Sequence, residues 1–270
     1  MSTSGLSLVD NSGQANNYSI VSASSDITQR PLNLSGSRAY DSTRTASGSD
    51  LSFTNIVSGE TLGLTGSGVL DSPAAGSRTI VNTNTLAISD GSGIATNYTL
   101  TNGTLTMTIV PRSTTVSGTK TYDGTTNVSS SNLTSFSNLA GSDTLSLSGT
   151  GTISSADVGT GKTVNTSGLT IDNSSGVGSN YTLSTATVNV TERVIGLSGV
   201  RAFDGTNNAS STDLSISNLV SGENLTLSGS GTVPNATVEM NKAITLGSLS
   251  ISDGSGAVSY THLTLPTSSV

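Results

Sequence analysis

Residue types that support disulfide formation, metal binding or acid–base catalysis are scarce in this sequence of 270 residues. It contains no cysteine and no tryptophan, one histidine, and only 3% aromatic residues. Without cysteine, neither a disulfide framework nor a thiolate metal site can form. A serine–histidine–aspartate triad would depend on His262, which lies in an atypical C-terminal stretch.

Charged residues and long apolar runs are scarce as well. Only 10% of the residues are charged, and 10 Lys and Arg against 17 Asp and Glu give a formal net charge of −7. A phosphate backbone requires a basic surface, so this balance argues against nucleic acid as a partner. No apolar run reaches the roughly 18 residues of a membrane-spanning helix. Residues 1–25 lack the pattern of a signal peptide, so an export signal is expected outside this sequence.

The sequence is instead rich in serine, threonine, asparagine and glycine, and it repeats itself every 81–82 residues. In one recurring block, a Ser-Gly dipeptide precedes a basic residue, an aromatic residue and an aspartate. The aromatic residues are Tyr40, Tyr122 and Phe203, which lie 82 and 81 positions apart. A second block reads Asn-Tyr-Thr-Leu at 97–100 and 180–183, and Asn-Tyr-Ser-Ile at 17–20. Such recurrence is typical of an array of repeated structural units.

Other positions recur at about the same spacing as these blocks. A Ser-Gly-Glu block occurs at 58–60 and 221–223, with a shortened copy between them. Nine of the ten basic residues fall into three columns, which are Arg30, Arg112 and Arg193; Arg38, Lys120 and Arg201; and Arg78, Lys162 and Lys242. We therefore predict the end of a truncated repeat at 1–27, repeat units at 28–109 and 110–190, and an incomplete unit at 191–270. From about residue 257 the last unit departs from the repeat pattern.

Within a unit, apolar residues alternate with polar ones, which indicates half-buried strands. Leu214 and Ile216 share one face of such a segment, as do Leu225 and Leu227. Each unit has room for about six or seven short strands separated by glycine, asparagine and serine turns. We expect an all-β protein in which small, antiparallel, sandwich-like units form an elongated array. A β-helix or solenoid is the alternative, although its coils need shorter periods than 81 residues.

The parity of the alternation changes near the end of each unit. In the first full unit the change falls at 101–104, where Asn102-Gly103 predicts a hairpin turn. The next unit changes parity between Leu183 and Val188 without an Asn-Gly dipeptide, so a bend or a bulge is an equal alternative.

The Tyr-Asp-Gly motif with its downstream Asn-Tyr-Thr-Leu block resembles the YDG-type repeat domain of large secreted bacterial adhesins, the filamentous-haemagglutinin-like surface proteins. The closest copy is Tyr122-Asp123-Gly124; Phe203-Asp204-Gly205 substitutes phenylalanine, and Tyr40-Asp41 is followed by serine. The resemblance extends to about residue 256. It implies a secreted or cell-surface, mostly-β stalk or adhesin module, and it brings no catalytic residues with it.

We interpret the repeated motif residues as structural. The aromatic residues of the motif are expected to be core anchors, and the aspartates are expected to close turns and to pair with the basic residue three positions earlier. The set comprises Tyr40, Asp41, Tyr122, Asp123, Gly124, Phe203, Asp204 and Gly205, together with Tyr98 and Tyr181 of the second block.

The sequence gives little support for metal binding or catalysis. Asp10, Asp90, Asp172 and Asp253 lie in glycine- and serine-rich turns, each with a single carboxylate, whereas calcium usually takes several. Calcium at the joints between units is thus a weak prediction, and no other cofactor and no enzyme activity is expected. We expect stalk or spacer repeats of a surface-attached bacterial adhesin, in which each repeat contacts its neighbours. The alternative is a repeated weak glycan- or protein-binding module that acts by avidity, in which Tyr98 and Tyr181 would be exposed.

Overall fold

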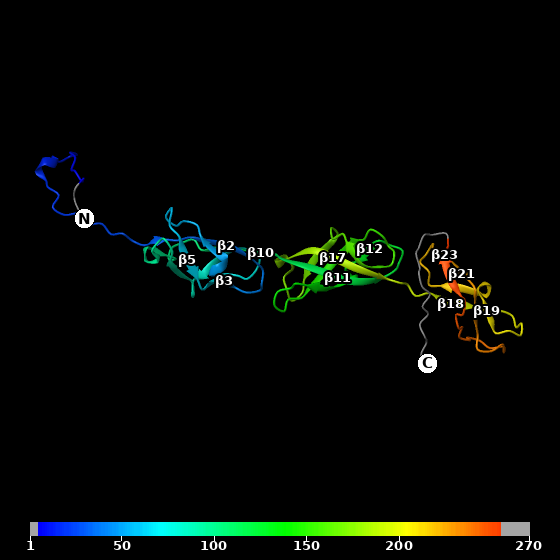
Figure 1. Cartoon of the computed structure of the whole chain (residues 1–270). Helices are drawn as coiled ribbons and strands as arrows, with labels where there is room; N and C mark the ends of the chain where they lie inside the picture. Colours follow the sequence, from blue (N-terminus) through cyan, green and yellow to red (C-terminus); the bar gives the residue numbers. More distant parts are fainter. Residues whose placement is uncertain (1–4, 255–270) are drawn as a thin grey trace. The chain divides into compact units, whose positions relative to one another are not determined.

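The computed structural model describes residues 5–254, and the chain divides into two compact units, Met1–Val110 and Pro111–Val270 (Figure 1). Each unit is described by itself. Both consist of strands and single-turn 3-10 helices, so the predicted all-β class with tandem repeats is confirmed. The described residues contain no helix with the length and hydropathy of a membrane span. The atypical stretch from residue 257, with His262, lies outside the described residues.

The first unit contains one large sheet and two strand pairs. The large sheet has the order β3-β6-β7-β10-β2-β4, and the pairs are β1-β9 and β5-β8. The strands are β1 (Arg30–Pro31), β2 (Leu34–Ala39), β3 (Thr45–Ser47), β4 (Leu51–Phe53), β5 (Leu62–Thr65), β6 (Ser67–Leu70), β7 (Gly76–Asn82), β8 (Ala87–Asp90), β9 (Tyr98–Thr99) and β10 (Thr106–Val110). The 3-10 helices are η1 (Ala15–Asn17), η2 (Gly48–Asp50) and η3 (Ala95–Asn97).

The second unit begins with the most regular of the repeats. Its two sheets have the orders β13-β11-β17-β15 and β12-β14-β16. The elements are β11 (Arg112–Thr121), β12 (Asn127–Ser129), η4 (Ser130–Asn132), β13 (Leu133–Ser137), β14 (Leu145–Thr152), β15 (Gly159–Val164), β16 (Leu169–Asn173), η5 (Gly178–Asn180) and β17 (Tyr181–Thr191). Nine buried side chains fill the space inside these strands: Val116, Tyr122, Val128, Leu133, Ile153, Val164, Ala186, Val188 and Val190.

The third repeat, in the same unit, has only strand pairs among its described residues. These pairs are β18-β20, β19-β22 and β21-β23. The elements are β18 (Gly196–Gly199), β19 (Asn208–Ser210), η6 (Ser211–Asp213), β20 (Leu214–Ser217), β21 (Leu225–Ser228), β22 (Ser230–Thr232) and β23 (Ser250–Asp253). All strand pairings in the described part of the chain join residues of one repeat, which is the organisation of separate units rather than of solenoid coils.

The first and last strands of a repeat are neighbours, and they run parallel. In the second repeat β11 pairs with β17 from Arg112↔Tyr181 to Thr121↔Thr191. In the first repeat β1 pairs with β9 and β2 pairs with β10, again in parallel. The antiparallel arrangement expected from the sequence holds for the other pairings, because short turns reverse the chain, whereas first and last strands are joined only through the whole repeat.

The hairpin predicted at Asn102-Gly103 is wrong. The strands on either side, β9 and β10, both run parallel to the start of their repeat and do not pair with each other. In the second repeat the same change of parity is a register shift inside β17, opposite Thr114 and Thr115. The bulge alternative is thus correct there, since an extra residue reverses the side-chain parity without reversing the strand. Asn102 has the left-handed φ of 64° that the dipeptide signals.

Candidate functional site

The aspartate of the Tyr-Asp motif closes a turn in each of the three repeats. Asp123 Oδ1 accepts hydrogen bonds from the backbone N–H and the hydroxyl of Thr125, both at 2.9 Å. It also receives the ammonium of Lys120 at 2.8 Å. The equivalent aspartates Asp41 and Asp204 bind the threonine two residues on and the arginine three residues back. The predicted pairing of the basic and acidic columns is present in every copy.

These contacts stabilise the ionised form of each aspartate relative to the protonated form. For Asp41 and Asp123, burial alone would raise the pKa, but hydrogen bonds from the nearby threonine and the adjacent cation outweigh it, so the pKa of each lies below its ordinary value. The backbone hydrogen bond from Thr206, followed by that from Arg201, lowers the pKa of Asp204 to about 2. A carboxylate so occupied by its own turn is a structural group.

The aromatic residue of the motif is buried in two repeats and exposed in the third. Tyr40 and Tyr122 are buried, with Tyr122 at 3% exposure, whereas Phe203 is 68% exposed. The core position expected for Phe203 is therefore wrong. In the first two repeats the backbone N–H of the tyrosine donates to the carbonyl that ends the last strand, Val110 or Thr191. The described residues of the third repeat contain no counterpart of that strand, so no described strand covers Phe203 in the same way.

The glycine of the motif has a conformational role and a packing role. Gly124 and Gly205 have φ of 73° and 76°, in the left-handed region that glycine adopts without a steric penalty. Ser42 stands at this position in the first repeat, with φ of 65°. A Cβ on Gly124 would lie 2.9 Å from Val220 Cγ1 of the third repeat, so the glycine also admits this neighbour.

The tyrosine of the Asn-Tyr-Thr-Leu block is buried and paired with a carboxylate. The Tyr181 hydroxyl donates to Asp143 Oδ2 at 2.6 Å and accepts the backbone N–H of Ala140 at 3.1 Å. In the first repeat the Tyr98 hydroxyl donates to Glu60 Oε2. This hydrogen bond to a carboxylate raises the pKa of Tyr98. Tyr98 and Tyr181 are only 4% and 5% exposed, so they do not form an aromatic surface.

A second tyrosine–carboxylate contact joins the second repeat to the third. The Tyr122 hydroxyl donates to Glu223 Oε1, across 101 positions of sequence. Glu223 occupies in the third repeat the turn position that Glu60 and Asp143 occupy in the first and second. In each of the three turns, the backbone N–H of this acidic residue donates to the carbonyl three residues before it. Its other oxygen, Oε2, is buried and has no hydrogen-bond partner among the described residues. Val220 of this turn packs against the core of the second repeat.

Sequence reasoning missed these pairs. The signal was present, because the Ser-Gly-Glu block and the Asn-Tyr block recur together in the first repeat, and the second repeat has Asp143 with Tyr181 at the equivalent positions. Two polar positions that recur together at a fixed separation indicate a contact.

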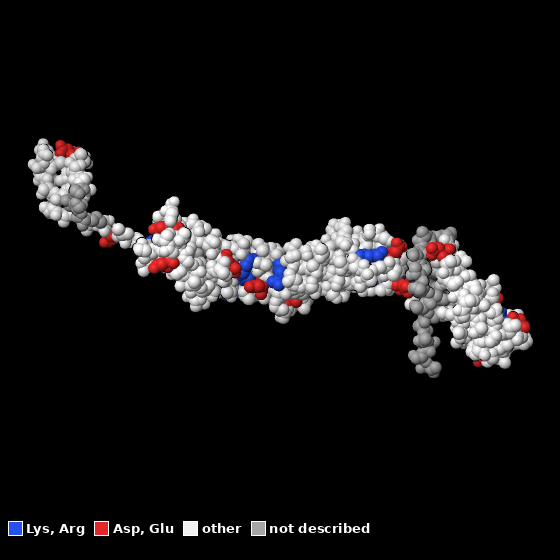
Figure 2. Space-filling model, viewed as in Figure 1, with Lys and Arg blue, Asp and Glu red and all other residues white. Residues whose placement is uncertain are grey.

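The repeated basic residues bind loops of their own repeat. Arg112 donates from Nε to the Asn138 carbonyl and from Nη2 to its Oδ1, both at 2.8 Å, and Arg193 makes the same pair of bonds to Asn218. Lys162 Nζ donates to the Ser155 carbonyl at 3.2 Å. On the face shown in Figure 2, residues that are neither basic nor acidic make up most of the surface. Arg112, Arg193 and Lys162 thus hold loops of their own repeat through backbone carbonyls.

The turn aspartates considered for calcium are not brought together. Asp90 Oδ1 accepts the backbone N–H of Ala95 at 2.7 Å, and Asp10 holds Ala15 in the same way. Within residues 5–254, no group of three or more histidine, cysteine, aspartate or glutamate side chains is arranged to hold a metal ion. The two aspartates Asp172 and Asp253 lie at the ends of β16 and β23.

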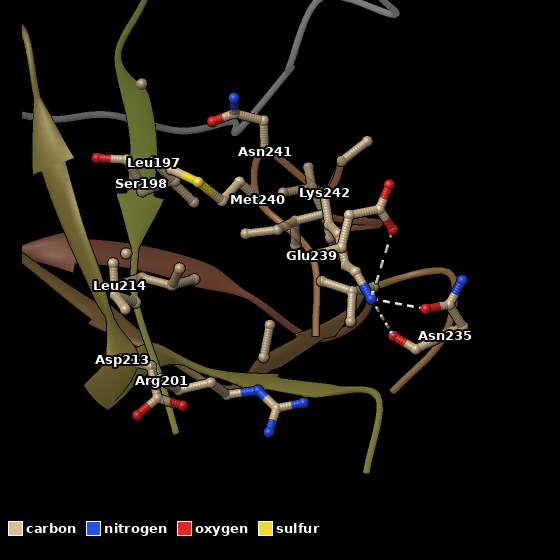
Figure 3. A pocket seen from close by; sticks show the side chains of 18 of the residues that line it. Leu197, Ser198, Arg201, Asp213, Leu214, Asn235, Glu239, Met240, Asn241 and Lys242 are labelled. Carbon is tan, nitrogen blue, oxygen red and sulfur yellow. Dashed lines mark hydrogen bonds and ion pairs between the residues drawn. The ribbon is translucent and has the colours of Figure 1, made fainter. Parts of the chain in front are cut away.

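The described residues of the third repeat surround a hollow. It is a cavity of about 980 Å³ between β18 and the segment 233–246 (Figure 3). Apolar side chains such as Leu197, Leu214 and Met240 line it, next to Arg201 and Lys242. Lys242 donates to Asn235 Oδ1 at 2.6 Å, so its charge is directed at a loop rather than into the hollow. Asp213 and Glu239 are the acidic residues in the lining of the cavity.

Comparison with known families gives one result. The sequence model of the YDG domain matches residues 28–107, 103–188 and 191–268, and so covers most of the chain in three copies. No curated protein and no solved structure matches the sequence significantly.

Proposed function

Because the chain belongs to the YDG-domain family along most of its length, we propose that it serves as a set of stalk or spacer repeats in a secreted or surface-attached bacterial adhesin. In this role the repeats hold an adhesive tip at a distance from the cell and bear the load between tip and anchor.

The observation that carries this proposal is the parallel pairing of the first and last strands. In the second repeat, β11 and β17 pair along ten residues, and the chain enters at the start of β11 and leaves at the end of β17. A force applied to the two ends therefore pulls the strands along each other, which loads all the hydrogen bonds of the pair together. An antiparallel terminal pair would instead open one bond at a time. A load-bearing module needs the first geometry.

The polar contacts support the same role. The tyrosines, aspartates and basic residues that recur in each copy are used within the repeats or between neighbouring repeats. The binding-module alternative would need exposed aromatic residues on repeated surfaces, yet Tyr98 and Tyr181 are buried. The two tyrosines that would form the binding surface of such a module are therefore not accessible to a ligand.

Single-molecule force spectroscopy on the full chain, attached by its two ends, tests the proposal. Unfolding of the second repeat should release about 80 residues at roughly 3.6 Å each, or about 290 Å of contour length, in one abrupt step. An Asn189→Pro substitution, which removes a donor from β17, should lower the force of that step, whereas Ser142→Pro outside the strands should not. Gradual extension with no step would refute a load-bearing role.

A glycan array probed with the full chain tests the alternative. Saccharide binding that the Tyr122→Phe or Tyr181→Phe substitution abolishes would favour the binding module over the stalk. Absence of saccharide binding together with abrupt force steps is the result that we expect.

A further inference from the structure

The first and last strands are paired less continuously in the first repeat than in the second. In the second repeat, β11 and β17 pair along all ten residues of β11, with one register shift (Figure 1). In the first repeat, two separate pairs take the place of this single one. β1 pairs with β9 at two positions, and β2 pairs with β10 at three. The two repeats therefore differ in the element through which a pulling force would pass.

The interruption in the first repeat comes from extra residues before its last strand. Pro31 pairs with Thr99, and Leu34 forms an isolated parallel bridge with Leu105. Five residues, 100–104, thus lie opposite only two residues of the chain that they follow, and most of the five are exposed. The second repeat has a single extra residue at its register shift. The first repeat therefore has a surface loop where the second has a bulge.

The loop 100–104 is attached to the first strand near its C-terminal end. The Thr104 backbone N–H donates to Asn33 Oδ1 at 2.8 Å, and the Leu34 N–H donates to the Thr104 carbonyl at 2.9 Å. Earlier in the loop, the Gly103 N–H donates to the Leu100 carbonyl at 3.3 Å, which is a contact inside the loop itself. The loop can therefore straighten once such internal contacts break.

This loop determines which hydrogen bonds bear a load. A force on the two ends of the repeat pulls the first strand at Arg30 and the last strand at Val110, in opposite directions. Load reaches the β1–β9 pair only through residues 100–104. The three surplus residues of this loop provide about 10 Å of slack at roughly 3.3 Å each. Hydrogen bonds tolerate changes of only about 0.5 Å, so β2 and β10 must separate before the β1–β9 pair is loaded.

The bulge in the second repeat leaves much less slack. β17 (Tyr181–Thr191) continues as one strand through the register shift, so its backbone is already extended there. The extra residue is also attached to the first strand, because Ser184 Oγ donates to the Thr114 carbonyl at 2.9 Å. The pairs on both sides of the bulge therefore share the load.

We propose that the first repeat unfolds before the second under load, and that the length of the loop 100–104 sets the force at which it unfolds. The two repeats lie in series in one chain, so they carry the same force. The six residues of β2 hold the first repeat, against the ten of β11 in the second. The first repeat should therefore unfold at roughly half to two-thirds of the force that the second withstands. As a device that limits the force on an adhesive tip, this order rests on the stalk role proposed above.

Single-molecule force spectroscopy on the full chain measures this order. Two variants identify the steps, because Thr108→Pro in β10 should lower or remove the step of the first repeat and Asn189→Pro in β17 that of the second. In the chain without substitutions, the step of the first repeat should occur at the lower force. Abrupt steps at equal force, or a lower force for the second repeat, would overturn this proposal and leave the stalk proposal standing. Gradual extension without steps would overturn both.

Exchanging the loop lengths tests the cause of the difference. Deletion of Asn102 and Gly103 leaves one surplus residue, as in the second repeat, and preserves the side-chain parity, so the force of the first repeat should rise to about that of the second. Insertion of Asn-Gly after Ser184 should lower the force of the second repeat to about that of the first. The matched control inserts the same dipeptide after Asp157, in the loop between β14 and β15, through which no load passes.

Urea unfolding separates slack from a general loss of stability. Each insertion lengthens one loop by two residues, which has a small entropic cost, so the two insertions should lower the urea midpoint by similar amounts. A control insertion after Asp157 that lowers the force as much as the insertion after Ser184 would overturn the proposal. A deletion variant that folds and unfolds at the original force would overturn it as well. If the deletion prevents folding of the first repeat, the insertion after Ser184 decides the outcome.

Discussion

The Tyr122–Glu223 hydrogen bond provides a direct test of how the second repeat holds the third. Replacing Tyr122 with phenylalanine keeps the buried ring but removes the hydroxyl that donates to Glu223 Oε1. Because Oε2 has no partner among the described residues, the carboxylate would lose the side-chain donor that it has. A hydrogen bond to a charged group contributes about 1.5–3 kcal/mol, so opening of the joint should become roughly ten- to a hundredfold more frequent.

Hydrogen exchange measured by mass spectrometry reports this opening. The Glu223 backbone N–H, which donates to the Val220 carbonyl at 3.0 Å, should exchange faster in Tyr122→Phe. Tyr181→Phe is the matched control, because it removes the same hydroxyl from a bond to Asp143 inside the second repeat. It should accelerate exchange near Asp143 and leave Glu223 unchanged.

A double-mutant cycle isolates the pair from other effects of each substitution. Glu223→Leu together with Tyr122→Phe should open the joint less often than the two single effects combined predict, because the double variant leaves neither partner unpaired. If Tyr122→Phe leaves exchange at Glu223 unchanged, the contact does not hold the joint and the reasoning fails.

Three further substitutions test single positions. Gly118→Ala should destabilise the second repeat in urea by about 3 kcal/mol or more, because its Cβ would lie 1.6 Å from the Asn132 carbonyl oxygen; a stable variant would contradict that close approach. Ser42→Gly should stabilise the first repeat by about 0.5–1 kcal/mol, since φ of 65° is strained for serine, and no gain would mean that the strain is relieved elsewhere. The pKa of Asp204, lowered from 3.8 to about 2, means that its stabilising contribution is present above pH 4 and is lost as the pH falls toward 2. Asp204→Asn should therefore weaken the third repeat at neutral pH and flatten its stability between pH 4 and 2, as followed by circular dichroism; an unchanged acid transition would refute this.

Local features of the fold could be predicted from the sequence. The alternation of Leu214 with Ile216 predicted β20, and that of Leu225 with Leu227 predicted β21. The motif aspartates form the expected turns, because an aspartate side chain reaches backbone N–H groups two residues away wherever the repeat lies. Each of these features depends on neighbours within a few positions.

The pairing of β11 with β17 could not be predicted in the same way. Alternation identifies which face of a strand is buried, but it contains no information on the partner strand or on its direction. Arg112 and Tyr181 are 69 positions apart, and their parallel pairing follows only from the closed arrangement of the repeat. The Asn102-Gly103 dipeptide was misleading for the same reason, since it specified a left-handed residue correctly but not whether the chain would reverse there.

The third repeat separates what the local sequence determines from what the whole repeat determines. Asp204 makes the same turn as Asp123, with the same threonine and basic partners, although β18 has no partner strand on its second edge in the described chain. Phe203, next to it, is exposed where Tyr122 is buried. The turn is thus made by neighbouring residues alone, whereas the buried tyrosines of the first two repeats lie against the end of the last strand, to which their backbone N–H groups donate.

This difference has a consequence for folding. The last strand supplies Ala186, Val188 and Val190 to the core, about 70 positions after the strand with which it pairs. Closure of so long a loop is entropically unfavourable until these side chains are in place, so a repeat cannot bury its core before its last strand is available. We therefore expect the turns and the η segments to form early, and most of the stability of each repeat to be gained when its last strand pairs.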